Sequence, residues 1–308
     1  MSELEQEVEA TFPVSKEELS IIRADLASDF PDDYLYLSDD YILSVASKPY
    51  SKDPTSRRPL DYSTSKLQDL LEWRDNNAVH LHAMIELAKG DEYADAAIEQ
   101  PAVYVKAKAL AVSLNYSSMY WHGLDKQGRP VLWIRTNRMP WFPDSEAQVN
   151  ALILLADAGI KAMPKGITDF VVLSDSNSPP PPNPSFLMSL LSALLRGYPD
   201  RLNLLVSCPV GTIISSVMKL LLPLMPTRLS SKIILISQED SKKKLGNILL
   251  NGVDDIPTFL GGTCDHDEFF PNGGAFKDQN LKFDFDGMVK RLTAASAAFK
   301  SSTVVNVD

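Results

Sequence analysis

The fold is decided by residues 198–236, which read YPDRLNLLVSCPVGTIISSVMKLLLPLMPTRLSSKIILI. Two short runs of branched apolar residues, Leu202–Val206 and Ile233–Ile236, are bounded by breakers, as buried strands of a parallel sheet usually are. Between them, Gly211–Leu222 has helical spacing and is stopped by Pro223. This succession of strand, helix and strand predicts a crossover unit of an α/β protein.

The predicted crossover helix has an unusually wide apolar surface. Thr212, Ser215, Ser216 and Lys219 fall at i, i+3, i+4 and i+7, so its polar residues form one narrow stripe. The apolar arc that remains is wider than one face of a sheet can cover. It fits a helix packed between the sheet and other helices. It fits equally a helix that covers an apolar ligand or meets a membrane.

The composition is that of a globular protein. The 308 residues, 44% hydrophobic and 23% charged, suffice for one large or two small domains. No apolar run reaches the length of a membrane span. The N-terminus has no apolar segment typical of a secretory signal, and the chain has only two cysteines, Cys208 and Cys264. We therefore expect a cytoplasmic protein that associates with membranes only transiently.

The net charge of −10 comes entirely from residues 1–40. This segment holds twelve acidic and two basic residues, a difference of −10, and the rest of the chain is neutral. Without a basic excess to neutralise phosphates, we expect no nucleic-acid partner. An acidic N-terminus is typical of a solvated tail, and we expect residues 1–14 to be disordered.

The remaining pattern predicts three further regions. A capping box at Ser15-x-x-Glu18 opens an all-α region over 15–114, in which Lys48–Leu60 is a loop rich in proline and serine. Residues 115–265 alternate strands and helices, which predicts a mostly parallel sheet with flanking helices. Residues 266–308 form an extension with one helix.

A hairpin is predicted at the start of the α/β region. The sequence Gly123-x-Asp125-x-x-Gly128-Arg129-Pro130 separates the alternating runs Ser117–Trp121 and Val131–Arg135. Aspartate and glycine favour the turn, and proline favours entry to the second strand.

Together these motifs resemble the CRAL-TRIO lipid-binding family, which includes phosphatidylinositol and phosphatidylcholine transfer proteins. The resemblance rests on the Gly123–Pro130 turn, on Tyr-Pro-Asp-Arg-Leu at 198–202, and on Pro-Thr-Phe-Leu-Gly-Gly at 257–262. It implies a lipid carrier of the CRAL-TRIO fold, in which the helix Gly211–Leu222 is the gate over an apolar cavity. The implied partners are a phospholipid or other hydrophobic lipid and a membrane surface. A bound lipid is expected, and no cofactor.

The resemblance also implies candidate site residues. In members that bind phosphatidylinositol, the acid after Tyr-Pro, a threonine and a lysine hold the headgroup. The corresponding acid is Asp200 and the lysine is Lys232, whereas Leu229 replaces the threonine and Thr227 lies nearby. The cavity and gate candidates are apolar residues of the strands and the gate helix, and as single residues they also fit an ordinary core. They are Val171, Leu173, Leu204, Val206, Cys208, Val217, Met218, Leu221 and Met225.

An enzyme is not expected. The chain contains no Gly-x-Ser-x-Gly, Walker or Gly-x-Gly-x-x-Gly motif. We expect no metal site: the run Asp265-His266-Asp267-Glu268 can bind a cation, but it is more typical of a solvated turn. The alternative function is a scaffold or regulatory module that kept the fold and lost lipid transfer. Such a module would bind a protein through the acidic N-terminus or through the prolines at 179–182.

Overall fold

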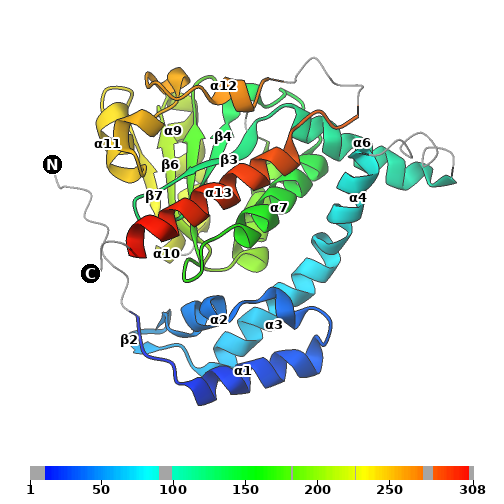
Figure 1. Cartoon of the computed structure of the whole chain (residues 1–308), viewed down its shortest axis with the longest axis vertical. Helices are drawn as coiled ribbons and strands as arrows, with labels where there is room; N and C mark the ends of the chain where they lie inside the picture. Colours follow the sequence, from blue (N-terminus) through cyan, green and yellow to red (C-terminus); the bar gives the residue numbers. More distant parts are fainter. Residues whose placement is uncertain (1–10, 90–98, 182, 226, 273–279, 305–308) are drawn as a thin grey trace. The chain divides into compact units, whose positions relative to one another are not determined.

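The computed structural model describes residues 11–89, 99–181, 183–225, 227–272 and 280–304. The chain folds as two compact units that divide between Asn76 and Asn77 (Figure 1). This division falls inside the predicted helical region 15–114, so the last helices of that region belong to the second unit. Of the predicted tail 1–14, residues 1–10 lie outside the described residues.

The first unit is mainly helical. Ser15 caps its first helix: its hydroxyl accepts a hydrogen bond from the Glu18 amide, and the Glu18 carboxylate accepts one from the Ser15 amide, so the capping box is confirmed. The predicted loop at Lys48–Leu60 contains a small antiparallel hairpin instead. The elements are α1 (Lys16–Asp29), η1 (Tyr34–Tyr36), α2 (Asp39–Ala46), β1 (Pro49–Tyr50), β2 (Asp53–Arg57) and α3 (Leu60–Asn77).

The three helices of the first unit share one apolar core. Ile22 and Leu26 of α1 lie one helical turn apart and are fully buried with Tyr41 of α2 and Leu67 of α3. Each helix contributes residues at i, i+3 or i+4, the spacing of a single buried face.

The second unit is built on a five-stranded sheet of order β3-β4-β5-β6-β7. β3 and β4 form the predicted antiparallel hairpin, and β4 to β7 are parallel. The strands are β3 (Met119–Leu124), β4 (Pro130–Arg135), β5 (Phe170–Asp175), β6 (Leu202–Cys208) and β7 (Ile233–Leu235). The predicted mostly parallel α/β fold with an N-terminal helical region is confirmed.

Helices surround this sheet on both faces (Figure 1). The helices longer than one turn are α4 (Val79–Lys89), α6 (Pro101–Asn115), α7 (Ser145–Lys161), α8 (Pro184–Ser192), α9 (Thr212–Leu221), α11 (Ser241–Ile248) and α13 (Phe285–Val304). The short helical segments are η2 (Thr136–Arg138), η3 (Ala193–Gly197), η4 (Leu222–Leu224), α10 (Thr227–Ser230), η5 (Gly252–Asp255), η6 (Thr258–Leu260) and α12 (His266–Phe269). No helix among the described residues is both long and apolar enough to cross a membrane.

One face of the sheet, which we call the α7 face, packs against α7 and α13. Trp121 of β3 is its anchor: the indole Nε1 donates a hydrogen bond to the Leu155 carbonyl of α7 at 2.6 Å, and the ring meets Phe170 edge-on. The Trp121 amide lies 3.4 Å from Met288 Sδ of α13. The C-terminal helix is therefore part of the core of the second unit.

The opposite face, which we call the α12 face, meets η6 and α12. Tyr120 and Trp133 lie on it, because they pair across the hairpin and alternate with Trp121. Tyr120 stacks on Phe270 with ring centroids 4.1 Å apart, and Trp133 meets Phe259 of η6 edge-on. The sheet is thus buried on both faces, as parallel sheets generally are.

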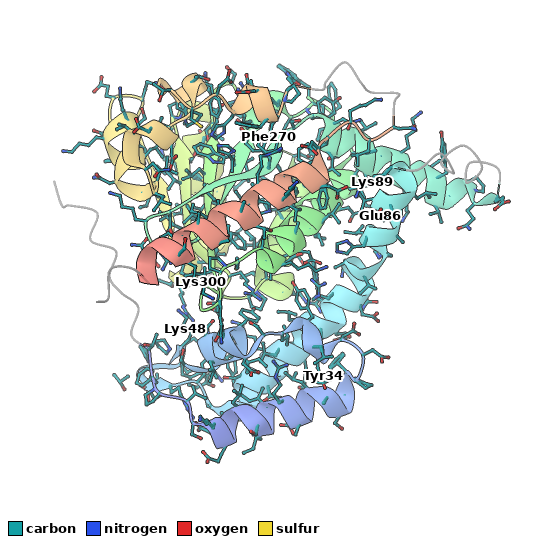
Figure 2. The ribbon with its side chains drawn as sticks, in the orientation of Figure 1. Tyr34, Lys48, Glu86, Lys89, Phe270 and Lys300 are labelled. Atoms are coloured by element: carbon teal, nitrogen blue, oxygen red, sulfur yellow. The ribbon has the colours of Figure 1, made fainter. Side chains whose placement is uncertain are left out.

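An ion pair links the first and last helices of this unit. The Lys89 ammonium of α4 lies 2.9 Å from Asp286 of α13 and 2.8 Å from Glu86. Figure 2 labels Lys89 and Glu86, which are one turn apart in α4.

Candidate functional site

The predicted cavity residues of the strands share the α12 face. Val171 pairs with Leu204 and Leu173 with Val206 in the register of β5 and β6, and Cys208 follows at the next position of the same face. All five side chains are buried. The structure therefore brings these sequence candidates together as one continuous apolar surface.

The described side chains of the predicted gate helix, α9, lie outside the core. None of its described side chains is buried, Met218 is half-buried, and Leu220 is 69% exposed. Met225, which follows η4, is also half-buried. The side chains of Val217 and Leu221 lie outside the described residues.

The candidate headgroup residues lie where β6 and β7 begin. Asp200 is in a left-handed turn (φ 60°) two residues before β6, and its carboxylate lies 3.3 Å from the Arg228 guanidinium. Lys232 immediately precedes β7, and its ammonium donates to the Leu202 carbonyl at 2.6 Å. Thr227 is exposed at the start of α10. Sequence reasoning missed Arg228, because its partner Asp200 lies 28 residues earlier and the local pattern does not reveal the pair.

A buried charge cluster closes the other end of the sheet. Asp267 Oδ1 accepts hydrogen bonds of 2.5 Å from both Arg135 and Arg138, whose side chains are almost fully buried. Asp175 Oδ2 lies 3.9 Å from Arg135 Nε, and burial raises the pKa of the Asp175 carboxyl. The cluster fixes the segment around Asp267 against the end of β4.

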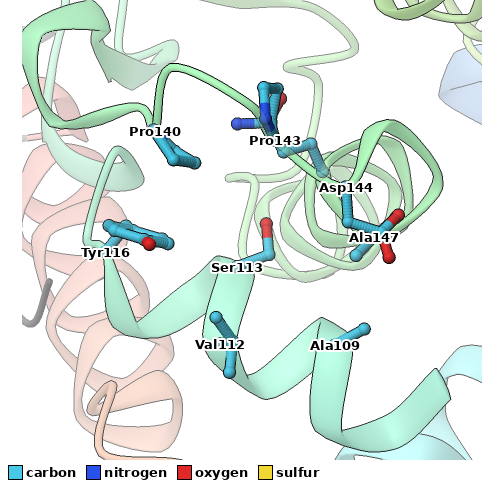
Figure 3. Close-up of a pocket in the computed structure, with 9 residues that line it drawn as sticks. Ala109, Val112, Ser113, Tyr116, Pro140, Pro143, Asp144 and Ala147 are labelled. Atoms are coloured by element: carbon cyan, nitrogen blue, oxygen red, sulfur yellow. The ribbon is translucent and has the colours of Figure 1, made fainter. Parts of the chain in front are cut away.

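A small pocket lies away from both of these sites. It is formed by α6 and by the loop that enters α7, with Tyr116, Pro140 and Pro143 around its mouth (Figure 3). Its cavity volume of about 40 Å³ holds at most a few water molecules, whereas pockets for drug-sized ligands measure roughly 300–1,000 Å³. We therefore do not assign it a lipid.

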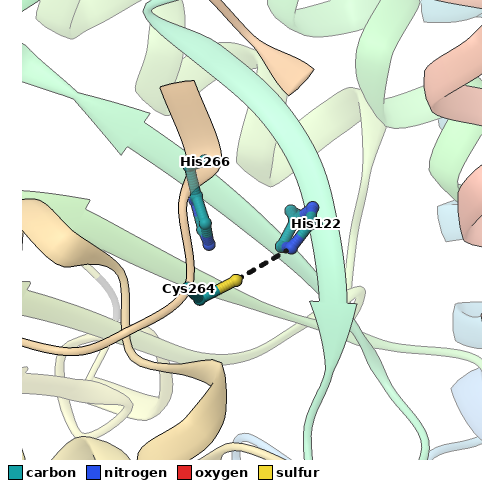
Figure 4. Close-up of side chains that lie close together, drawn as sticks. All are labelled: His122, Cys264 and His266. Atoms are coloured by element: carbon teal, nitrogen blue, oxygen red, sulfur yellow. Dashed lines mark hydrogen bonds between the residues drawn. The ribbon is translucent and has the colours of Figure 1, made fainter. Parts of the chain in front are cut away.

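Three potential metal ligands converge beside the α12 face. His122 of β3, Cys264 and His266 each offer one ligand atom, and these atoms all lie within 4.8 Å of one another (Figure 4). Cys264 Sγ is 3.5 Å from His122 Nε2, and the two imidazole centroids are 4.2 Å apart. His266 Nδ1 lies 3.1 Å from the Tyr120 hydroxyl.

The surroundings of this cluster keep its imidazoles neutral. Burial, assisted by His122 and the two arginines, lowers the pKa of His266 to about 2, and burial also lowers the pKa of His122. Burial raises the pKa of the Cys264 thiol. His266 is fully buried, and its Nε2 has no hydrogen-bond partner. An unsatisfied buried group of this kind costs about 1–3 kcal/mol.

The burial of His266 corrects the prediction of a solvated turn at 265–268. The local sequence is strongly polar, but His266 is buried by the nearby ring of Phe259 and by the rings of Tyr120 and Trp133, which are far away in the chain. The sequence signal that was available is the pair Cys264-x-His266, a spacing that places two ligand types on one short segment.

Comparison with known proteins identifies a domain in the second unit. Residues 114–262 match the CRAL/TRIO domain. A search of curated proteins gives no match. Among solved structures, that of Sfh5 is similar, with 14% sequence identity, a TM-score of 0.49, and coverage of 87% of this chain and 91% of that chain. The second unit therefore contains a CRAL/TRIO domain, which spans residues 114–262.

Proposed function

We propose that the second unit of this protein binds one hydrophobic lipid against its sheet, behind α9, and exchanges or presents that lipid at membranes. The observation that carries the proposal is that α9, although built from apolar residues, buries none of its described side chains. These described side chains would give up little buried surface if α9 moved away from the sheet.

The apolar surface on the neighbouring strands supports the binding half of the proposal. Leu173, Leu204 and Val206 offer a wall without charge on the α12 face. Each methylene of an acyl chain that leaves water for such a wall contributes about 0.8 kcal/mol. Contact between this wall and an acyl chain of ordinary length is therefore sufficient to hold the lipid tightly without a covalent bond.

Exposed apolar residues support the membrane half of the proposal. Trp141 and Phe142 are 69% and 93% exposed in the loop after η2, and Leu220 of α9 and Leu224 of η4 are also exposed. The loop follows β4 and therefore lies at the carboxyl edge of the parallel strands, whereas Leu220 and Leu224 lie in the crossover that returns to the start of β7. Aromatic residues at such an edge suit the interface of a bilayer.

Asp200, Lys232 and Thr227 are the proposed headgroup contacts. An acid and a lysine can bind the hydroxyl and phosphate groups of a phosphorylated polyol by charge-assisted hydrogen bonds. Arg228 adds a second cation beside Asp200. A bound headgroup would replace the present partners of these side chains. We therefore expect the headgroup contacts to contribute more to the choice of lipid than to the affinity for it.

The proposal is tested by native mass spectrometry of the purified protein after incubation with mixed phospholipid vesicles. We expect one lipid per chain, identified by its mass. In the Leu204→Phe variant, a larger side chain enters the proposed site and lipid occupancy falls. Leu205→Phe is the matched control, because Leu205 is the next residue of the same strand and lies on the α7 face. A lipid-free wild-type protein from every vesicle composition would favour the scaffold alternative.

A further inference from the structure

The His122, Cys264 and His266 cluster has the geometry of a metal site. For bonds of about 2.0 Å to nitrogen and 2.3 Å to sulfur, a tetrahedral ion separates its nitrogen and sulfur ligands by about 3.5 Å. Cys264 Sγ and His122 Nε2 lie 3.5 Å apart. The widest separation within the set is below 4.8 Å, so closure around an ion requires a contraction of roughly 1 Å.

The unpartnered nitrogen of His266 points to a ligand. His266 is fully buried, yet its Nε2 has no hydrogen-bond partner. In the tautomer protonated at Nδ1, the imidazole donates to the Tyr120 hydroxyl at 3.1 Å and Nε2 keeps a free lone pair. This is the usual arrangement of a histidine ligand, in which a second residue fixes the tautomer and orients the ring.

The backbone around Cys264 is also fixed before any ion binds. The Cys264 amide donates to the Ile256 carbonyl at 3.1 Å, and its carbonyl accepts from the Thr258 amide at 2.9 Å. Gly262 permits this close contact, because a Cβ there would lie 1.9 Å from the Ile256 carbonyl oxygen. On the other side of His266, two arginines hold Asp267.

We propose that His122, Cys264 and His266 bind a divalent transition-metal ion of the zinc type. Two imidazoles and a thiolate are preferred ligands of such ions, and a water molecule completes the tetrahedron. Binding releases the Cys264 thiol proton to solvent and forms the metal–sulfur bond, without any change of oxidation state. The ion ties the segment that follows the Gly261-Gly262 turn to β3, the edge strand of the sheet.

Cobalt titration of the reduced, tag-free full chain tests this site. We expect one Co²⁺ per chain, with the visible bands of tetrahedral cobalt and a near-ultraviolet thiolate-to-cobalt band, and one equivalent of Zn²⁺ should remove both. Cys264→Ser should lose the thiolate band. The second cysteine and an exposed histidine offer matched controls, so Cys208→Ser and His80→Gln should retain the full spectrum.

Two further variants separate binding from folding. His122→Asn removes a half-buried ligand and should weaken Co²⁺ binding at least tenfold, with an unchanged far-ultraviolet circular dichroism spectrum. Tyr120→Phe removes only the orienting hydroxyl. It should weaken binding by about 10- to 100-fold and keep the thiolate band. The proposal is overturned if wild-type protein shows no cobalt bands at millimolar Co²⁺, or if folded Cys264→Ser or His122→Asn protein binds as wild type does.

Discussion

Gly159 of α7 lies directly against the indole of Trp121, so closely that a Cβ at position 159 would stand 2.2 Å from Trp121 Cζ2. This contact lets α7 approach β3 and brings the Trp121 Nε1 proton to the Leu155 carbonyl. The packing of the α7 face therefore depends on a residue without a side chain.

Gly159→Ala should destabilise the second unit. Alanine has a higher helix propensity than glycine, which stabilises the helix by about 1 kcal/mol. Overpacking of a filled core, however, costs about 1–3 kcal/mol, and we expect a cost near the upper limit because the contact is so short. We expect a net loss of about 1–2 kcal/mol in the free energy of unfolding, measured by chemical denaturation. Trp121→Phe should relieve the clash, so the double variant should lose less than the sum of the two single variants. Strict additivity would contradict this contact.

The first unit should weaken in acid through Glu18. Hydrogen bonds from Arg57 and from the Ser15 amide lower the pKa of Glu18 to about 2 from its ordinary 4.5. Because the folded pKa is the lower one, the stabilisation is complete above pH 4.5 and is lost as the pH falls toward 2. Hydrogen exchange of the α1 amides as a function of pH measures this loss. Glu18→Gln should flatten the profile over this range, and Glu17→Gln, one residue earlier in the helix, should leave it unchanged.

Asp267→Asn should destabilise the end of the sheet. The substitution leaves the guanidinium groups of Arg135 and Arg138 buried without their shared carboxylate. Loss of a charged hydrogen-bond partner costs about 1.5–3 kcal/mol, and Asp175 compensates only in part, since it lies 3.9 Å from Arg135. Chemical denaturation should show a loss of about 2 kcal/mol. The neighbouring surface change Glu268→Gln should cost less than about 0.5 kcal/mol.

The exposed aromatic pair should govern membrane contact. Replacement of both Trp141 and Phe142 by alanine removes two large apolar side chains that make few contacts in the folded protein. Binding to phospholipid vesicles, measured by sedimentation, should fall at least tenfold while thermal stability stays unchanged. Leu35→Ala is a suitable control, because Leu35 is 72% exposed and belongs to the first unit. Equal losses in both proteins would argue against a specific membrane surface.

Much of the fold could be predicted from local sequence patterns. The run Leu202–Val206 has the length and branching of a buried strand, and the observed strand extends to Cys208. The Gly123–Pro130 turn predicts the hairpin because its chemistry is local. The alternation of side chains along β5 and β6 then places Leu173 and Val206 on one face. These features follow from periods of two and 3.6 residues, which a sequence displays directly.

The features that escaped prediction depend on distant contacts. His266 lies in a polar run, and only the fold brings it to Tyr120, 146 residues earlier. Arg228 pairs with Asp200 across a whole crossover unit. The hairpin at Pro49–Arg57 lacks the alternation of apolar residues that marks a strand, so its sequence predicts a loop. In each case the partner, and not the local pattern, determines the structure.

The proposed binding of a lipid against the sheet, behind α9, can be tested with a phospholipid that carries a photoreactive group at the end of its acyl chain. After vesicle incubation, removal of the vesicles and irradiation, peptide mapping locates the label. We expect label on the peptides of β5, β6 and α9, reduced in Leu204→Phe and unchanged in Leu205→Phe. Label confined to the 141–142 loop, or equal label in both variants, would contradict it.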